Sequence, residues 1–249
     1  MHVAGAETAL KLHNLWTSFR KHAPRLCNCL WRGRVYNPDC DSMKSNTMSD
    51  FQQASRDLIT AGRQLYAMGM VPATSGNFSA RLADGTVAIT VSGRHKGKLT
   101  EADIMRINMQ GESLDSQKPS AETLLHTFLY QRYPDIGVVL HPHSVNATVI
   151  SRLCDDWLAL QDYEILKAFP GIDTHECAVR LPVFDNDQDI QRLSQRIDSC
   201  LAGHHDLPGY LIRGHGFYTW GENLDGALRH VEAFEFLFDC ELRLRKAGA

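Results

Sequence analysis

Two histidines separated by one residue, His141 and His143, are the first candidates for chemistry in this sequence. They lie at the end of an apolar segment, residues 136–141, that is typical of a buried strand. Successive side chains of a strand alternate between its faces, so both imidazoles point the same way if the extended conformation continues. Two imidazoles on one face need a third ligand to form an open zinc site. Taken alone, the pair is more typical of two hydrogen-bonded histidines at a strand end.

A third histidine, His215, lies between Gly214 and Gly216 at the end of the apolar segment 210–212. The flanking glycines give the backbone freedom and place no side chain in the way of a ligand. His215 is therefore a candidate third ligand, although a turn with a solvated histidine explains the same residues. Other histidines, among them His126, lack a paired ligand and are interpreted as structural or solvated.

Three short segments rich in small and hydroxyl residues are candidates for binding an anion. Residues 74–79 and 90–93 form turns at strand ends, where consecutive backbone N–H groups can surround an anion. Residues 118–122 place Ser120 and Glu122 at the start of a helix, whose unpaired N–H groups also favour negative charge. None of the three has the spacing of a Walker loop or a dinucleotide-binding fingerprint. Each alone is also compatible with an ordinary turn or helix cap.

The hydrophobic pattern predicts the elements that must position these residues. Ser49 and Gln52 form a capping-box signature, and apolar residues at helical spacing follow to about residue 68. Strands are predicted at 77–82, 86–92, 103–108, 136–141, 177–184 and 209–219, and further helices at 120–133, 144–153, 187–202 and 222–246. The alternation of strands and helices without a linker or internal repeat indicates one α/β domain over residues 48–249.

Composition and charge exclude some classes of protein. The formal net charge of −3 gives no electrostatic reason to expect binding to nucleic acid or to a membrane surface. No apolar run approaches the roughly 20 residues that a membrane span needs. The seven cysteines have irregular spacing that does not resemble a disulfide framework, which favours a reducing cytoplasm.

Residues 1–47 differ from the rest of the chain. They hold seven Lys and Arg against three Asp and Glu, and they lack sustained helical or strand periodicity. The scarcity of serine argues against an organelle transit peptide, and Cys27, Cys29 and Cys40 lack a fourth ligand at zinc-finger spacing. We expect a disordered N-terminal extension or a start-site artefact, with the functional domain beginning near Met48.

Five motifs in register resemble those of the class II aldolase family: Gly-Asn-x-Ser, Ser-Gly, Pro-Ser-x-Glu, His-x-His and His-Gly. The resemblance covers roughly residues 50–247, and the order of the motifs makes it specific. It implies an α/β/α sandwich on a mixed, largely antiparallel central sheet, in a homotetramer with active sites at subunit interfaces. It also implies a sugar-phosphate substrate and one zinc ion per subunit, with His141, His143 and His215 as the ligands.

The same resemblance assigns roles to the anion-binding segments. The phosphate would be held by Gly76, Asn77, Ser92, Gly93 and Ser120. The acid/base glutamate of the family's aldolases corresponds to Glu122.

Within the family, residues 164–167, 211–216, 219–221 and 234–238 look most like the methylthioribulose-1-phosphate dehydratases of methionine salvage. This likeness implies a zinc-dependent carbon–oxygen lyase that converts 5-methylthioribulose 1-phosphate to 2,3-diketo-5-methylthiopentyl 1-phosphate. It makes Glu164 the acid/base, with a solvated helix carboxylate as the alternative. It also makes Lys96 a phosphate contact, with a surface lysine as the alternative.

Two other functions fit the same sequence. A sugar-phosphate aldolase or epimerase of the family would share the zinc and phosphate sites and differ in the placement of its acid/base groups. The adducin head domain, which has a similar fold, is an interaction module without catalysis. The presence of all three histidines and both glutamates argues against that module.

Overall fold

Eight β-strands form one sheet, in the order β3-β2-β1-β4-β8-β7-β6-β5, within the residues that the computed structural model describes, 49–204 and 207–248. Every neighbouring pair is antiparallel except β6 and β7, so the sheet is mixed and largely antiparallel, as predicted. The expected extension, residues 1–47, lies outside this description. The strands are β1 (Asn77–Arg81), β2 (Val87–Thr90), β3 (Ile104–Ile107), β4 (Val138–His141), β5 (Trp157–Gln161), β6 (Ala178–Phe184), β7 (Gly209–Ile212) and β8 (Gly216–Gly221).

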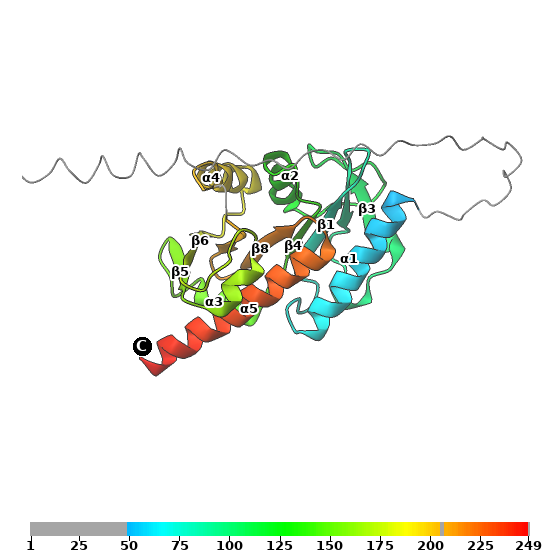
Figure 1. The fold of residues 1–249 in the computed structure, drawn as a ribbon. Helices are drawn as coiled ribbons and strands as arrows, with labels where there is room; N and C mark the ends of the chain where they lie inside the picture. Colours follow the sequence, from blue (N-terminus) through cyan, green and yellow to red (C-terminus); the bar gives the residue numbers. More distant parts are fainter. Residues whose placement is uncertain (1–48, 205–206, 249) are drawn as a thin grey trace, which may run out of the picture. The chain divides into compact units, whose positions relative to one another are not determined.

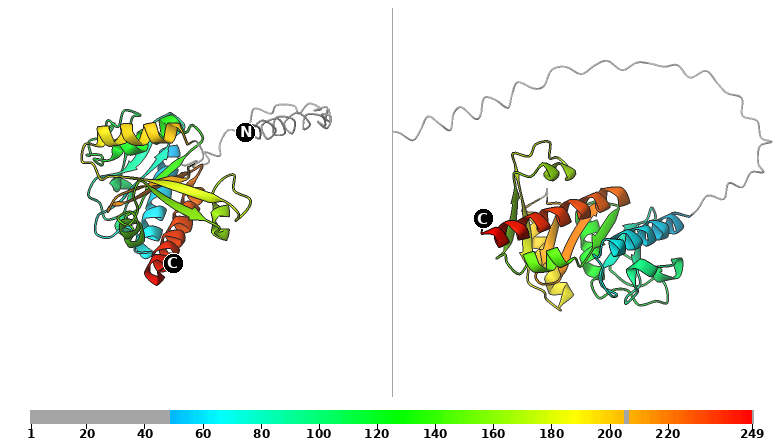
Figure 2. Two further views of the ribbon diagram at one scale, coloured as in Figure 1. Left: turned by 90° about the vertical axis from the view of Figure 1, so that its left-hand side faces the viewer. Right: turned by 90° about the horizontal axis from the view of Figure 1, so that it is seen from below.

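Helices cover both faces of this sheet, which gives the predicted α/β/α sandwich. α2 and α4 lie on one face, and α1, α3 and α5 lie on the other (Figure 1). Figure 2 shows the same layers, with α1 and α5 in front of the sheet when the domain is seen from below. The helices are α1 (Asp50–Ala67), α2 (Thr123–Arg132), α3 (Val145–Ile150), α4 (Ile190–Ala202) and α5 (Leu224–Ala247), with short 3-10 helices η1 (Lys96–Lys98), η2 (Glu101–Asp103) and η3 (Glu164–Ala168). No helix in the described ranges is long and apolar enough to cross a membrane.

Two hydrophobic cores hold the layers together, one on each face of the sheet. Strand alternation divides the buried residues between them, because successive side chains point to opposite faces. In β4, Val139 belongs to the core under α2 and α4, whereas its neighbour Leu140 belongs to the core under α1 and α5. Strand β4 is therefore buried on both sides, which fits its continuous apolar sequence.

The start of α1 confirms the capping box predicted from sequence. The Ser49 hydroxyl accepts from the backbone N–H of Gln52 at 3.2 Å, and the Gln52 side chain accepts from the backbone N–H of Ser49 at 3.0 Å. Two unpaired backbone donors are thereby satisfied at the end of the helix, which fixes where the helix begins.

Two elements depart from the predicted pattern. The predicted strand 209–219 is two strands, β7 and β8, joined by a turn at residues 213–215. Strand β5 was not predicted; it lies at the edge of the sheet and pairs with β6. Its exposure alternates, with Leu158 and Leu160 buried and Ala159 exposed, but the pattern is too short to stand out in the sequence.

Candidate functional site

The three predicted histidine ligands meet at one edge of the sheet because β4 lies between β1 and β8. Strand β4 ends at His141, and Asn77, the first residue of antiparallel β1, pairs with His141. The other antiparallel neighbour, β8, begins at Gly216, directly after His215. Antiparallel pairing therefore places the start of each neighbour beside the end of β4. Motifs far apart in the sequence become adjacent without any long loop.

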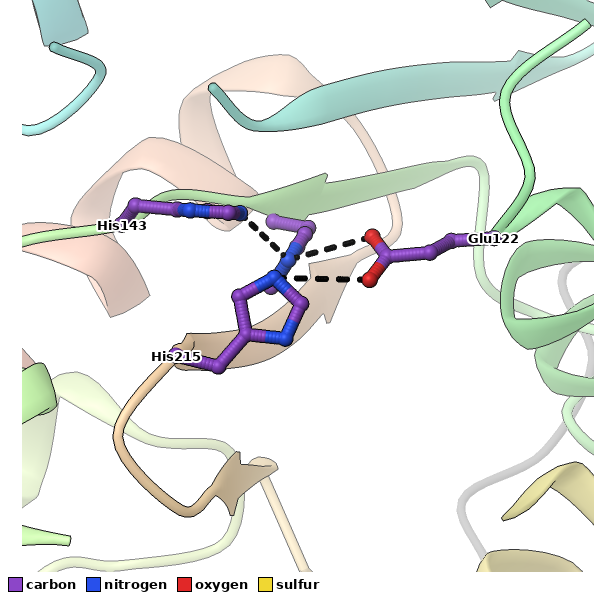
Figure 3. Close-up of side chains that lie close together, drawn as sticks. Glu122, His143 and His215 are labelled. Carbon is purple, nitrogen blue, oxygen red and sulfur yellow. Dashed lines mark hydrogen bonds and ion pairs between the residues drawn. The ribbon is translucent and has the colours of Figure 1, made fainter. Parts of the chain in front are cut away.

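Four side chains converge at this edge: Glu122, His141, His143 and His215, whose ligand atoms all lie within 4.8 Å of one another. Nε2 of His141 is 2.8 Å from Nε2 of His143 and 3.3 Å from a carboxylate oxygen of Glu122. Nε2 of His215 is 3.4 Å from the other Glu122 oxygen. Figure 3 shows His143, His215 and Glu122 reaching toward one centre from three separate segments.

The hydrogen bonds of His141 indicate that this cluster fits a metal ion. Its Nδ1–H donates to the carbonyl oxygen of Phe217 at 2.8 Å, so Nε2 keeps a free lone pair. Burial, reinforced by neighbouring imidazoles, lowers the pKa of both His141 and His143. A cation beside the two Nε2 atoms would be bound by the lone pairs of both neutral rings. Imidazole nitrogens on a tetrahedral zinc ion would be about 3.3 Å apart, so the two Nε2 atoms, 2.8 Å apart here, would separate slightly around an ion.

Glu122 is held at the cluster by two donors. The side-chain amide of Asn77 donates to its Oε2 at 2.8 Å, and the hydroxyl of Tyr218 donates to the same oxygen at 3.0 Å. The Tyr218 ring stacks on His141, with centroids 4.0 Å apart. Burial raises the pKa of Tyr218, so its hydroxyl stays protonated and able to donate. Sequence reasoning missed Tyr218, because an aromatic residue in a strand is usually part of a core.

A cavity of about 510 Å³ opens beside the cluster and is lined by both His143 and His215. Its walls contain most of the small and hydroxyl residues singled out in the sequence. The lining includes all six predicted phosphate contacts, Gly76, Asn77, Ser92, Gly93, Lys96 and Ser120, together with Asn186, Gln188 and Ile190, which were not predicted. The last three follow β6, where no sequence signal distinguishes them from an ordinary loop and helix start.

Two of the predicted phosphate contacts are shaped by close packing. Gly76 has φ +76°, and a Cβ there would lie 2.7 Å from the carbonyl oxygen of His141, so this turn requires glycine. Lys96 is buried rather than on the surface, and its Nζ donates to the carbonyl oxygens of Thr74 at 3.0 Å and Arg94 at 2.8 Å. Burial lowers the pKa of Lys96 to about 8.

The turn that carries His215 is anchored to α3 and to β4. A Cβ on Gly216 would lie 2.3 Å from the carbonyl oxygen of Pro142, so only glycine lets β8 start this close to the end of β4. The backbone N–H of Gly214 donates to the hydroxyl of Ser151 at 2.9 Å, and the hydroxyl of Thr148 donates to the carbonyl oxygen of His215 at 3.0 Å. The imidazole therefore reaches the cluster from a turn that is fixed on two sides.

Glu164 lies apart from this cluster within the chain. It begins η3, its side chain is 73% exposed, and Lys167 donates to its carboxylate at 2.7 Å. His175 lies 3.6 Å from the same carboxylate, and Glu164 does not line the cavity. One chain thus brings together every predicted site residue except Glu164.

Comparison with known protein families places this geometry in context. Residues 56–242 match the family described as Class II Aldolase and Adducin N-terminal domain. The chain belongs to this family. The group of three histidines and a glutamate, which could hold a metal ion, therefore lies in a class II aldolase domain.

Relatives within the class II aldolase family match this chain over nearly their whole length. The protein of Methylococcus capsulatus named methylthioribulose-1-phosphate dehydratase is 57% identical over 196 residues, which cover 79% of this chain and 96% of that protein. The protein of Azotobacter vinelandii with the same name is 60% identical over 195 residues, which cover 78% and 95%. These relatives are named as dehydratases, which are carbon–oxygen lyases.

Solved structures of class II aldolases have the same fold. An L-fuculose 1-phosphate aldolase aligns with a TM-score of 0.67 at 22% identity, covering 79% of this chain and 88% of that chain. The L-fuculose-1-phosphate aldolase from Thermus thermophilus aligns with a TM-score of 0.64 at 24% identity, covering 78% and 95%. At these identities the likeness establishes the architecture alone.

Proposed function

We propose that this chain is a methylthioribulose-1-phosphate dehydratase, which removes water from 5-methylthioribulose 1-phosphate and forms 2,3-diketo-5-methylthiopentyl 1-phosphate in methionine salvage. The observation that carries the proposal is the 60% identity to the Azotobacter vinelandii dehydratase over 95% of that protein. The histidine cluster and the cavity beside it supply a metal site and an anion site next to each other, as a sugar-phosphate substrate requires.

We assign one zinc ion per subunit to the Nε2 atoms of His141, His143 and His215. When bound, zinc supplies a Lewis acid that polarises the carbonyl and hydroxyl oxygens of the substrate. The bond from His141 Nδ1–H to Phe217 fixes the tautomer that such a ligand needs. Because His143 and His215 line the cavity, the open side of the cluster faces the substrate.

The substrate phosphate occupies the part of the cavity lined by the turns after α1 and β2. Gly76 and Gly93 both have positive φ, which turns backbone N–H groups toward one side of each turn. Ser92 and Ser120 add hydroxyl groups that donate to phosphate oxygens. Lys96 lines the same cavity, and its ammonium group, which donates to the carbonyl oxygen of Thr74, attracts the anion.

The dehydration needs groups that move protons. A base takes the proton from C3, and the electron pair left behind is delocalised into the C2 carbonyl. This pair then forms the C3–C4 double bond and expels the hydroxyl group from C4. That hydroxyl accepts a proton and leaves as water, and the enol that remains becomes the ketone at C3. We assign this acid/base work to Glu164. Glu122 lies at the N-cap of α2 without capping it through its side chain, and its carboxylate, beside the imidazoles, keeps the charge of the cluster low.

Glu164 acts in this proposal from a neighbouring copy, because within one chain it is exposed and outside the cavity. We place the contact with that copy at a row of exposed apolar side chains on α3 and just after it. Val145, Val149 and Leu153 follow at helical spacing, two residues after His143, and are 70%, 41% and 54% exposed. Exposed apolar rows are typical of protein interfaces. We therefore propose a homotetramer with active sites at the subunit interfaces.

Product analysis tests the reaction. Zinc-loaded wild-type protein incubated with 5-methylthioribulose 1-phosphate is expected to give one product that is lighter by one water and keeps every carbon, as measured by mass spectrometry. Two smaller fragments would indicate the aldolase, an isomer of unchanged mass would indicate the epimerase, and unchanged substrate would favour the non-catalytic module.

Light scattering tests the assembly separately. Val149→Asp places a charge in the proposed interface and is expected to give smaller species with little activity. A Val149→Asp protein that keeps the size and activity of the wild type would contradict the interface.

We also infer a cytoplasmic location. All four cysteines within the described ranges, Cys154, Cys177, Cys200 and Cys240, are free thiols. Free thiols are typical of reducing compartments.

A further inference from the structure

A buried histidine outside the metal cluster, His126 of α2, lies behind Glu122. Its side chain has no exposure, and both ring nitrogens have polar partners. Nδ1 is 2.7 Å from the hydroxyl of Ser79, and Nε2 contacts Oδ1 of Asn77. Asn77 in turn contacts Glu122, so His126 is one residue removed from a group in the metal cluster.

The directions of these hydrogen bonds follow from the chemistry of their ends. An ionised carboxylate only accepts, so the NH₂ group of Asn77 faces Glu122 and donates at 2.8 Å. Oδ1 of Asn77 therefore faces His126, whose Nε2 must carry the proton and donate it. Nδ1 is then an acceptor and takes the hydroxyl proton of Ser79, whose oxygen accepts from the hydroxyl of Tyr130 at 2.8 Å.

Every donor in this series of hydrogen bonds points toward the candidate metal site at Glu122. The order is Tyr130, Ser79, His126, Asn77 and Glu122, and the last bond ends on the carboxylate. A reversed Asn77 amide would turn its carbonyl oxygen toward the carboxylate of Glu122, and the two oxygens would repel. The N–H of His126 prevents that reversal because it needs an acceptor.

We propose that His126 is a positioning residue for Glu122: its Nε2–H fixes the Asn77 amide so that an N–H always faces the carboxylate at the metal cluster. The inference deepens the proposed dehydratase function and rests on it where catalysis is measured. Burial lowers the pKa of His126 to about 4, so at neutral pH the ring keeps one donor and one acceptor. A doubly protonated ring would carry a proton on Nδ1 as well, and that nitrogen could no longer accept from the hydroxyl of Ser79.

Two substitutions of His126 separate positioning from packing. In His126→Gln the side-chain amide reaches the place of Nε2 and still donates to Asn77, while the partner of Ser79 is lost. In His126→Asn the shorter amide still accepts from Ser79, while the donor to Asn77 is lost. Each variant removes one buried hydrogen bond, so their losses of melting temperature should be similar.

Activity should distinguish the two variants. We expect kcat to fall about 10–100-fold in His126→Asn, the range found for groups that orient metal-site residues, with KM nearly unchanged. His126→Gln should stay within about threefold of wild type. Equal kcat values for the two variants would overturn the proposal, because a purely structural role depends on neither ring nitrogen in particular.

A double-mutant cycle tests whether the effect passes through Glu122. In a Glu122→Gln background, His126→Asn should cost much less than it does in the wild type. Full additivity of the two losses would place the action of His126 elsewhere. If the wild type itself does not dehydrate the substrate, the proposed function fails rather than this inference.

A spectroscopic readout tests the inference without any variant or substrate. In ¹⁵N-histidine-labelled wild-type protein at pH 7, the His126 ring should give the NMR signature of a neutral imidazole protonated on Nε2. A ring protonated on Nδ1, or one carrying both protons, would overturn the inference whatever the activity of the enzyme.

Discussion

Arg213→Met is expected to destabilise the protein and to weaken its metal binding, because Arg213 anchors the turn that carries a proposed ligand. Its Nη1 donates to the carbonyl oxygens of Ser151 at 2.9 Å and Cys154 at 2.5 Å, and its Nη2 donates to that of Asp155 at 2.9 Å. Its Nε also pairs with Asp185 at 3.0 Å. The guanidinium group therefore holds the segment at the C-terminal end of α3 against the turn between β7 and β8.

The magnitude follows from these four contacts. A hydrogen bond contributes about 0.5–1.5 kcal/mol net, so three bonds to carbonyl oxygens contribute about 2–4 kcal/mol to the free energy of unfolding. The ion pair adds under about 1 kcal/mol, because the Asp185 side chain is 68% exposed. A loss of that size lowers the melting temperature of a domain this large by about 5–15 °C. Methionine keeps most of the apolar stem, so packing changes little.

Calorimetry and zinc titration check this expectation, with Arg243→Met as the matched control. Arg243 is 77% exposed, and among the residues that the structure describes it forms an ion pair only with Asp239 on the same helix, so its loss should change the melting temperature little. In Arg213→Met, zinc affinity should also fall about tenfold as the turn loosens. The reasoning would be refuted if Arg213→Met melted like the control and bound zinc as tightly as the wild type.

Four further outcomes are expected. Purified protein should hold about one zinc per chain by elemental analysis, and His215→Ala should lose most of it; full retention would remove that residue from the site. Glu164→Gln should lower kcat by about 10²–10⁴ at nearly unchanged KM, and Glu122→Gln should cost less; the opposite order would favour aldolase-type chemistry. KM should rise as pH passes through about 8, where Lys96 loses its charge, and Lys96→Met should show a high KM at every pH. A chain that begins at Met48 should match the full chain in melting temperature and turnover; a large loss in either would show that residues 1–47 contribute.

Local sequence patterns predicted the strands and turns that carry the site. The pairing of the strands determines which side chains meet there. Strand β4 and the His-Gly turn were recognisable because alternation and glycine act within a few residues. The contact between Glu122 and the histidines depends on how α2 packs over β1 and β4, which no local pattern encodes. The partners of His126 come from the same packing. Glu164 was identified by resemblance alone, and it reaches the cluster only in the proposed assembly, from a neighbouring copy.

The position of β8 in the sheet has a consequence for how the protein is made. Strands β3, β2, β1 and β4 form one half of the sheet, β7, β6 and β5 form the other, and β8 joins them. Until β8 emerges from the ribosome, β4 and β7 each expose an unpaired edge, and exposed edges invite aggregation. Because β4 ends at His141 and β8 starts at Gly216, the edge of β4 stays unpaired while residues 142–215 are made, whereas β7 is completed just before β8. Strand β8, which pairs with both edges, also brings His215 beside β4. An ion bound by all three imidazoles would therefore show that the two halves of the sheet are joined.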